Sequence, residues 1–316
     1  MIRLSAGTAA SLGLTSGRMD ACPTTAYLLA GNQCLMKCSF CPQGVGGNET
    51  LSRLGRITWP EYAWAEVEKV LVRAGEKGIR RICLQAVRPF DGIAPLFAVI
   101  DRIKAVSELP LSLSAWIHSA DEAAALIAAG VERISVSLDV VNPEAHEKIK
   151  GGSLQRRLEL LLHCAHNFPG RMSTHIICGL GETEAEAITL IDSLIRADVT
   201  VALFAFIPLK GTPLERVEPP AVESYRRIQA GYYLLRKKAA LLSSFTFEEG
   251  RLVSYGLPEK ELTKILAAGT AFQTSGCPDC NRPYYNERPG GVIYNYHRPL
   301  SRAECKKALL ELTDCQ

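Results

Sequence analysis

Three cysteines near the start of the chain have the spacing of iron–sulfur ligands. The stretch NQCLMKCSFCPQG holds Cys34, Cys38 and Cys41 in the order C-x3-C-x2-C, and it follows an apolar run that predicts a β-strand. Thiolates at these intervals on one loop can hold three corners of a [4Fe–4S] cube and leave the fourth iron open for a substrate or cofactor. A structural zinc site would need a fourth cysteine or a histidine close by, and this stretch offers none.

The remaining cysteines point to several roles. The chain has 11 cysteines, an odd number, and its N-terminal segment lacks the continuous apolar run of a signal peptide. Metal or redox use is therefore expected rather than disulfides. A second close pair, Cys277 and Cys280, stands in SGCPDCNRPYYNERPGG, where prolines and glycines predict fixed turns. Cys164 on a predicted helix and Cys178 on the outer face of a predicted strand are expected to be core residues.

The overall composition narrows the class of partner. The chain has 316 residues, of which 47% are hydrophobic, and its net charge is +3. The basic residues form no run, so no nucleic-acid partner is expected. No stretch of about 18 apolar residues occurs, so no membrane span is expected, and a cytoplasmic location follows as an expectation.

Short apolar runs alternate with helical patterns along most of the chain. The predicted strands are Ala26–Gly31, Arg80–Gln85, Leu111–Ile117, Arg133–Leu138, Met172–Cys178 and Val201–Ile207. The predicted helices are Trp59–Lys77, Gly92–Val106, Asp121–Ala129, Ser153–Asn167, Glu182–Ala197 and Ala221–Leu241, with two more at Pro258–Ala268 and Ser301–Leu312. Six strand–helix units are too few for a closed eight-stranded barrel, so an α/β fold with a partial (β/α)6 TIM-type barrel is predicted over 22–247. Residues 1–21 form an N-terminal arm or helix, and 248–316 form an extension that carries the second cysteine pair.

With this cysteine loop the sequence resembles the radical S-adenosylmethionine (SAM) superfamily. The stretches RRICLQAVRP, SVSLDVVNPEAHEKIKGGSLQRRLELL, HIICGLGETEAEA and FIPLKGTPLE look like its biotin synthase and hydrogenase-maturase branch, and the resemblance runs from about Thr24 to Glu215. It implies a partial barrel, a [4Fe–4S] cluster that chelates SAM, and reductive cleavage of SAM to a 5′-deoxyadenosyl radical.

The resemblance also implies which residues contact SAM. Ser137 and Asp139 leave the fourth predicted strand with both side chains on one face, and they match the pair that binds the ribose diol. Arg157 matches the arginine that pairs with the SAM carboxylate, a group that suits the guanidinium fork. Gln85 matches the residue that holds the SAM amino group. The alternatives are a loop carboxylate for Asp139 and a solvated helix residue for Arg157.

The adenine contacts are implied in the same way. Ile177 and Gly179 on the fifth predicted strand, and backbone groups near Phe40, match positions that lie beside the adenine. Glu182 opens the following predicted helix, so it is expected to be a carboxylate of the helix N-terminus rather than a ligand.

Radical SAM enzymes that add sulfur draw it from a second iron–sulfur cluster, here expected to be [4Fe–4S]. Cys277 and Cys280 are expected to supply two of its ligands. The first choice for a third is Cys22, in DACPTTAYLL, which precedes a proline as Cys277 does. The alternative is Cys83, which matches a cluster ligand of biotin synthases, although LSLSAWIHS offers no match for that family's other cluster cysteine. Cys305 is a candidate for the fourth ligand.

The tail CPDCNRPYYNERPGGVIYNY and the entry TTAYLLAGNQCLMKCSFCPQ resemble one member of the two-protein lipoyl synthases. This implies sulfur insertion at C6 or C8 of an octanoyl chain on a lysine of a lipoyl carrier protein. It also implies a second radical SAM protein as partner and an electron donor such as ferredoxin or flavodoxin. The run Arg282–Arg288 then lines a mouth for the octanoyl-lysyl arm or docks the carrier; the alternative is that its tyrosines only pack the tail onto the barrel.

Two other functions remain open at this point. One is a radical SAM maturase or mutase that acts on a small amino acid and keeps a second metal site that is not consumed. The other is a non-enzymatic iron–sulfur scaffold or electron-transfer protein. The SAM contacts implied for Asp139 and Arg157 argue against the scaffold, which has no use for them.

Replacing Cys34, Cys38 and Cys41 together by alanine should abolish formation of 5′-deoxyadenosine, because the cluster that reduces SAM loses its ligands. The product is measured chromatographically after anaerobic incubation with SAM and a reductant. A triple variant that still cleaves SAM at the normal rate would contradict the assignment.

Overall fold

The computed structural model describes residues 1–17, 19–31, 34–44, 52–88 and 92–313. Its centre is an eight-stranded sheet with the strand order β10-β9-β8-β7-β6-β2-β1-β5. Six neighbouring strands run parallel and follow one another in the sequence. These are β2 (Thr25–Ala30), β6 (Arg81–Ala86), β7 (Leu111–Ser114), β8 (Arg133–Ser135), β9 (Met172–Cys178) and β10 (Thr200–Ala205). The predicted partial barrel of six strand–helix units is confirmed.

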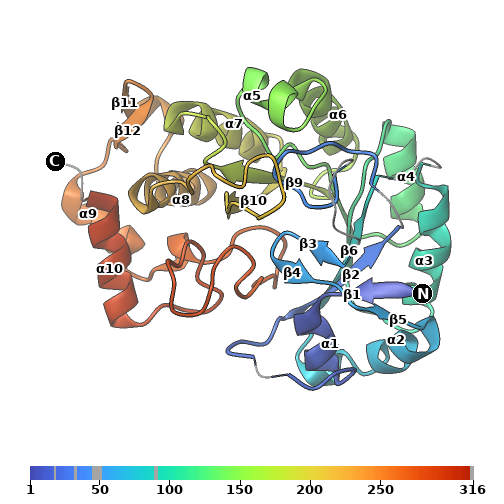
Figure 1. Ribbon diagram of the computed structural model, residues 1–316. Helices are drawn as coiled ribbons and strands as arrows, with labels where there is room; N and C mark the ends of the chain where they lie inside the picture. Colours follow the sequence, from blue (N-terminus) through green and yellow to red (C-terminus); the bar gives the residue numbers. More distant parts are fainter. Residues whose placement is uncertain (18, 32–33, 45–51, 89–91, 314–316) are drawn as a thin grey trace.

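One layer of helices covers the outer face of the parallel strands (Figure 1). Its members are α2 (Trp64–Leu71), with the 3-10 turn η1 (Gly75–Lys77), α3 (Ala94–Lys104), α4 (Ala120–Ala128), α6 (Leu154–Asn167), α7 (Glu184–Arg196) and α8 (Val222–Arg236). Side-chain caps start several of them, as where the hydroxyl of Thr183 accepts a hydrogen bond from the amide of Glu186. A further helix, α5 (Pro143–Ile149), was not predicted from the sequence, because seven residues are too few for a clear apolar period.

The N-terminal segment belongs to the sheet and is more than an arm. Strand β1 (Ile2–Leu4) pairs antiparallel with β2 and with β5 (Glu61–Tyr62), and α1 (Ala6–Leu12) follows it. Strands β3 (Arg53–Leu54) and β4 (Ile57–Thr58) form a small hairpin. The helix predicted from Trp59 begins only at Trp64, because Trp59 is buried against Leu29 and Val87.

The C-terminal extension is anchored on α8 through buried polar contacts. It contains η2 (Leu242–Ser244), β11 (Thr246–Glu248), β12 (Arg251–Ser254), α9 (Glu259–Leu266), η3 (Thr270–Phe272) and α10 (Arg302–Thr313). The guanidinium of Arg226, 1% exposed, donates to Glu311 of α10 at 2.9 Å and to the Tyr294 carbonyl at 2.6 Å. A fully buried arginine with these partners ties the extension firmly to the barrel, since a lost partner would leave a buried charge uncompensated.

Residues 275–286 of the extension close the open side of the six-stranded barrel. The amide of Leu203 on β10 donates to the hydroxyl of Ser275 at 2.9 Å. At the other side of the opening, the amide of Thr24, next to β2, donates to the Asn281 side chain at 2.9 Å. In Figure 1 these orange-red loops accordingly lie between β10 and the blue N-terminal elements. The tail therefore bridges the space between β10, an edge strand of the sheet, and the chain just before β2.

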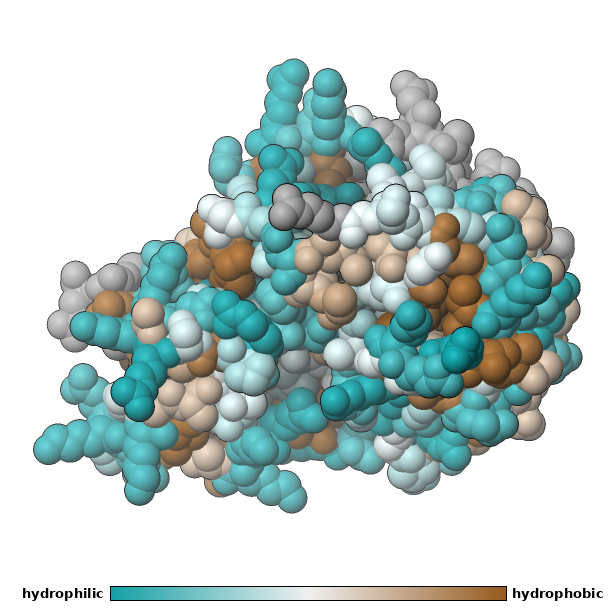
Figure 2. Space-filling model, turned by 90° about the horizontal axis from the view of Figure 1, so that it is seen from below, coloured by the Kyte–Doolittle hydropathy of each residue, from teal (hydrophilic) through white to brown (hydrophobic). Residues whose placement is uncertain are grey.

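The outer surface is mixed in polarity. On the face in Figure 2, hydrophobic residues form separate patches between hydrophilic side chains. No helix in the described part of the chain is both long and apolar enough to cross a membrane.

A glycine fixes the turn that leaves β9. Gly179 has φ +99°, and a Cβ built on it would lie 2.7 Å from Cδ of Pro220. The carboxylate of Glu182 accepts hydrogen bonds from the amides of Gly179 at 2.6 Å and Leu180 at 3.0 Å. Glu182 thus lies in the turn before α7 and caps backbone donors, which corrects the prediction that it opens the helix.

Gly179→Ala should lower the free energy of unfolding by about 1–3 kcal/mol, because the side chain meets Pro220 in a conformation that L-residues rarely adopt. Urea titration followed by circular dichroism measures this. Gly75→Ala is the matched control, since a Cβ at Gly75 would have no atom within 4 Å and the φ of this residue is not positive. Equal stability of the two variants would show that the turn tolerates a side chain.

Candidate functional site

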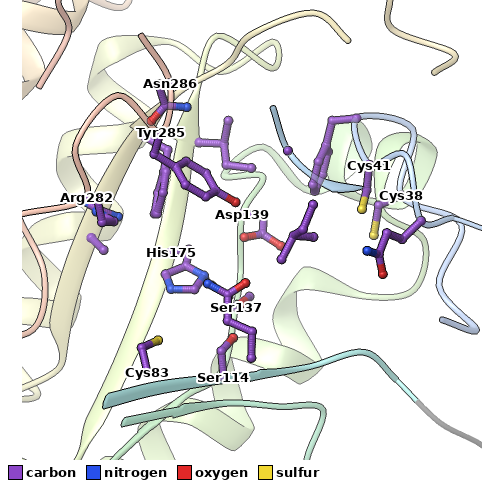
Figure 3. A pocket seen from close by; sticks show the side chains of 18 of the residues that line it. Cys38, Cys41, Cys83, Ser114, Ser137, Asp139, His175, Arg282, Tyr285 and Asn286 are labelled. Atoms are coloured by element: carbon purple, nitrogen blue, oxygen red, sulfur yellow. Dashed lines mark hydrogen bonds between the residues drawn. The ribbon is translucent and has the colours of Figure 1, made fainter. Parts of the chain in front are cut away.

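A cavity of about 310 Å³ lies inside the barrel. Side chains from β2, β6, β7, β9 and β10 line it, together with the loop after β8, the cysteine loop 34–44 and the tail. In Figure 3, Cys38 and Cys41 lie on one side of the cavity and Cys83 on the other, with Asp139, Ser137 and His175 between them. A largely apolar cavity with a few convergent polar groups has the character of a ligand site.

The first three cysteines all border this cavity, at the end where β2 delivers the chain. The loop is held by the Ser39 amide, which donates to the Ile149 carbonyl at 2.7 Å. Burial raises the pKa of the Cys38 thiol to about 12 and that of Cys41 to about 11. The free thiols are therefore protonated at neutral pH, and binding of iron must release protons.

Three cysteine thiols on one loop can each bind a different iron of a [4Fe–4S] cube. Three soft sulfur donors on one loop that faces a cavity are the donor set such a cube requires.

Asp139 and Ser137 line the cavity next to this loop, and a lysine that the sequence did not suggest joins them. The Lys150 ammonium forms a buried ion pair with Asp139 at 2.7 Å and donates to the Leu138 carbonyl at 3.3 Å. Asp139 has φ +62°, so the chain turns sharply where its carboxylate enters the cavity. The carboxylate is thereby held in place with its charge balanced, and its remaining lone pairs can accept hydroxyl groups.

Arg157 on α6 reaches the cavity and is 8% exposed, so it is not a solvated helix residue. One guanidinium nitrogen donates to the Ile117 carbonyl at 2.7 Å, and the group lies 4.0 Å from the centroid of the Trp116 ring. Its Nε is buried and has no hydrogen-bond partner among the described residues. Burial lowers the pKa of Arg157 to about 10, and the nearby Asp139 opposes this. A buried cation with a free donor is suited to an anionic group such as a carboxylate.

His175 on β9 is a second cavity residue that the sequence analysis missed. Its Nδ1 lies 3.1 Å from the hydroxyl of Ser137, and its ring packs edge-on against Phe204 at 5.3 Å. Phe204 in turn contacts Tyr285 and the Arg282 guanidinium, which lies 3.9 Å from its ring centroid. Burial lowers the pKa of His175 to about 4, so its imidazole is neutral at pH 7.

The cysteines of the tail enter the same cavity. Cys277 and Cys280 line it together with Cys83 of β6. The hydroxyl of Tyr27 lies 3.3 Å from Sγ of Cys280, and that of Ser112 lies 3.6 Å from Sγ of Cys277. Burial raises the pKa of the Cys83 and Cys277 thiols. The tail thus places two thiols opposite the first cysteine group.

Several predicted residues lie elsewhere. Cys22 is exposed and does not line the cavity. It contacts the tail through its backbone, because its carbonyl accepts a hydrogen bond from the Asn281 side chain at 2.9 Å. Gly179 also does not line the cavity, because it forms the turn after β9.

Cys305 lies in a separate groove between α9 and α10. Cys164 and Cys178 are buried in the core as predicted, and Cys315 lies outside the described residues. The predicted contacts Phe40, Gln85 and Ile177 border the cavity.

The comparison with known families agrees with this geometry. The model of the radical SAM superfamily matches residues 28–194, which is more than half of the chain. The chain belongs to the radical SAM superfamily. The family implies a [4Fe–4S] cluster and SAM, and Cys34, Cys38 and Cys41 are the residues that fit the cluster.

Relatives within the superfamily act in different ways. The chain is 27% identical over 209 residues to a protein named biotin synthase from Halorhodospira halophila. The aligned residues cover 64% of this chain and 61% of that protein. It is 29% identical over 161 residues to a GTP 3′,8-cyclase from Peptoclostridium acidaminophilum, covering 49% and 47%. The chain therefore spans about half to three-fifths of these relatives.

Solved structures share the fold. HydG, a maturase of [FeFe]-hydrogenase, matches with a TM-score of 0.56 at 12% identity, over 67% of this chain and 50% of that one. Methylornithine synthase (PylB) matches with a TM-score of 0.52 at 17% identity, over 67% and 62%. At such low identity these matches support the fold and no particular activity.

The two missed residues differ in how well the sequence signals them. His175 precedes Ile177 by two positions on one strand, so alternation places both on the inner face and would have found it. Lys150 follows α5 and meets Asp139 only through the folding of that unpredicted helix, and no local pattern marks it.

Arg157→Ala should weaken SAM binding by roughly 10- to 150-fold without loss of iron, since a hydrogen bond to a charged group contributes about 1.5–3 kcal/mol. Titration with SAM, followed by the EPR signal of the reduced cluster, measures the affinity. Arg156→Ala is the matched control, because Arg156 is exposed on the same helix. Unchanged SAM affinity in the Arg157 variant would refute the assignment.

Proposed function

We propose that this radical SAM enzyme inserts sulfur into an octanoyl chain carried on a lysine, as one component of a lipoyl synthase. The observation that carries the proposal is the second group of thiols, Cys83, Cys277 and Cys280, in the same cavity as the first. Two cysteine groups that share one cavity suit a reaction in which a radical is made at one and sulfur is supplied at the other.

The bound groups would supply the chemistry as follows. SAM and a cluster held by Cys34, Cys38 and Cys41 would supply the radical that takes a hydrogen atom from the octanoyl chain. A cluster held by the second group of thiols would supply the sulfide for the new C–S bond and would accept the electron released. A 5′-deoxyadenosyl radical is an oxidant strong enough for an unactivated C–H bond.

The chain's own residues bind and orient the reactants. Arg157, with its unpartnered Nε, is placed to hold the SAM carboxylate, and Asp139 with Ser137 is placed to hold the ribose hydroxyls. Lys150 keeps the Asp139 carboxylate fixed at 2.7 Å. Trp116 packs against the Arg157 guanidinium at 4.0 Å from its ring centroid and helps to orient it.

The cavity wall suits an alkyl chain better than an amino acid. The β10 side of the cavity presents Ala202, Phe204 and Phe206. Asp139 is the single carboxylate among the described residues that line the cavity, and Lys150 already neutralises it. An amino-acid substrate would bring an ammonium group for which this wall has no free carboxylate, so the maturase or mutase alternative is less well supported.

The relatives give partial support. Biotin synthase, by its name, forms biotin, and the chain resembles several proteins of that name. Others are named for the cyclisation of GTP. Sulfur insertion as a class rests on this likeness, and the octanoyl substrate rests on the tail resemblance and the apolar cavity.

The proposed partners follow from the substrate and the redox step. An octanoylated lipoyl carrier protein presents the lysine arm, a second radical SAM protein shares the two sulfur insertions, and a ferredoxin or flavodoxin supplies electrons. Arg282, Tyr285 and Asn286 of the tail line the cavity, so this part of the tail is the proposed contact for the arm.

The double variant Cys277→Ala, Cys280→Ala should separate radical formation from sulfur transfer. The loop of the first cluster needs nothing from these two thiols, so 5′-deoxyadenosine should still form while no thiolated product appears. The test is anaerobic reconstitution with SAM, a reductant and an octanoyl-lysyl peptide, with both products read by mass spectrometry.

The matched control for this test is Cys305→Ala, whose thiol lies in the groove between α9 and α10. It should leave both products unchanged. A double tail variant that still makes thiolated peptide would remove the main support for sulfur insertion.

A further inference from the structure

The floor of the barrel, at the N-terminal ends of β6, β7 and β8, holds a concentration of thiols. Cys83 comes from β6, and Cys277 and Cys280 come from the tail, nearly two hundred residues later along the chain. All three line the same cavity. Because these segments are far apart in the sequence, the three thiols come together only when the whole chain is folded.

The tail thiols are held in fixed positions. The amide of Cys280 donates to the carbonyl of Cys277 at 3.2 Å and closes a turn. Just before it, Gly276 has φ +122°, and a Cβ there would lie 2.9 Å from that of Ala202. The Arg81 guanidinium donates to the Pro278 carbonyl at 3.1 Å. Backbone contacts on both sides therefore preorganise the two sulfur atoms without a disulfide.

Two buried guanidinium groups lie beneath these thiols. Arg81 is 4% exposed and Arg133 is 9% exposed. The Arg81 guanidinium donates to the Ser112 hydroxyl at 2.9 Å, and this hydroxyl lies 3.6 Å from Sγ of Cys277. They share one carboxylate, Glu132, at 2.5 Å from Arg81 and 3.7 Å from Arg133. The Nε of Arg133 is buried and has no hydrogen-bond partner in the described part of the chain. The floor thus carries more positive than negative charge, which is costly unless an anion is bound there.

We propose that Cys83, Cys277 and Cys280 hold an iron–sulfur cluster on the floor of the barrel, and that Arg81 and Arg133 balance its negative charge. A cluster bound by three thiolates is anionic, so its negative charge balances the positive charges of the two arginines. Cys22, exposed and outside the cavity, is not a ligand. The hydroxyl of Ser112 donates to the sulfur atom of Cys277, and the hydroxyl of Tyr27 lies within hydrogen-bond distance of the sulfur atom of Cys280. The cluster does not depend on the substrate, and its test is separate from the test of sulfur insertion.

The ligands are tested by iron content in the full-length chain with Cys34, Cys38 and Cys41 replaced by alanine. After anaerobic reconstitution, this variant should keep roughly four irons per chain, all of them on the floor. Adding Cys83→Ser or Cys277→Ser should reduce the iron to near zero, whereas adding Cys22→Ser should leave it unchanged. Circular dichroism checks that each variant is folded.

Three results would overturn the ligand set. They are iron retained in the Cys83→Ser variant, iron lost in the Cys22→Ser variant, and zinc in place of iron in the parent. Failure of the chain with all its cysteines, reconstituted with full iron, to make thiolated peptide would instead count against sulfur insertion and leave the floor cluster in place.

The role of the arginines is tested by the reduction potential of the floor cluster in the same parent. A nearby positive charge stabilises the reduced, more negative form, so Arg133→Gln should shift the midpoint to lower potential and Arg133→Lys should restore most of it. Arg171→Gln is the control, because Arg171 is exposed at the same end of the barrel and its charge is screened by water. An unchanged midpoint in Arg133→Gln with full iron content would overturn charge balancing by the arginines.

Discussion

A barrel of six parallel strands cannot close on itself, and the rest of this structure depends on how that opening is closed. The edge strand β10 would otherwise expose unpaired backbone groups, which attract non-native pairing. Here the tail supplies partners, with Ser275 bound to the Leu203 amide and Asn286 donating to the Ala205 carbonyl at 2.7 Å. The segment that satisfies the edge also carries Cys277 and Cys280, so the closure of the fold and the construction of the cavity are one event.

The cavity that results has a distinct charge pattern from one end to the other. Near the first cysteine loop, Asp139 and Lys150 neutralise each other and Arg157 keeps a free donor. At the floor, Arg81 and Arg133 outnumber their single carboxylate partner, Glu132. Between the two ends lie the neutral His175 and the aromatic wall of Phe204 and Tyr285. The middle of the cavity is thus mainly aromatic, although the Arg282 guanidinium packs on the Phe204 ring there.

The parts of this architecture that depend on local pattern could be predicted from the sequence. The six inner strands appear as short apolar runs, and the spacing of Cys34, Cys38 and Cys41 marks the first site without knowledge of the fold. Predictions failed where the outcome depends on distant contacts. Trp59 leaves the predicted helix because it packs on Leu29 and Val87, and Gly179 turns away because Pro220 lies against it. Whether Cys22 or Cys83 lies beside the tail thiols depends on the path of the tail, and the sequence pattern around either cysteine does not show this path.

The distance along the chain between Cys83 and Cys277 has a consequence for how the protein matures. The first three cysteines lie within eight consecutive positions, so the loop that holds them is complete once the N-terminal part of the barrel exists. The floor thiols meet only after the last strand has paired and residues 275–286 have settled across the opening, and contacts of such long range form late in folding. For the proposed floor cluster, iron would therefore bind later than at the first cysteine loop, while residues 275–286 settle across the opening.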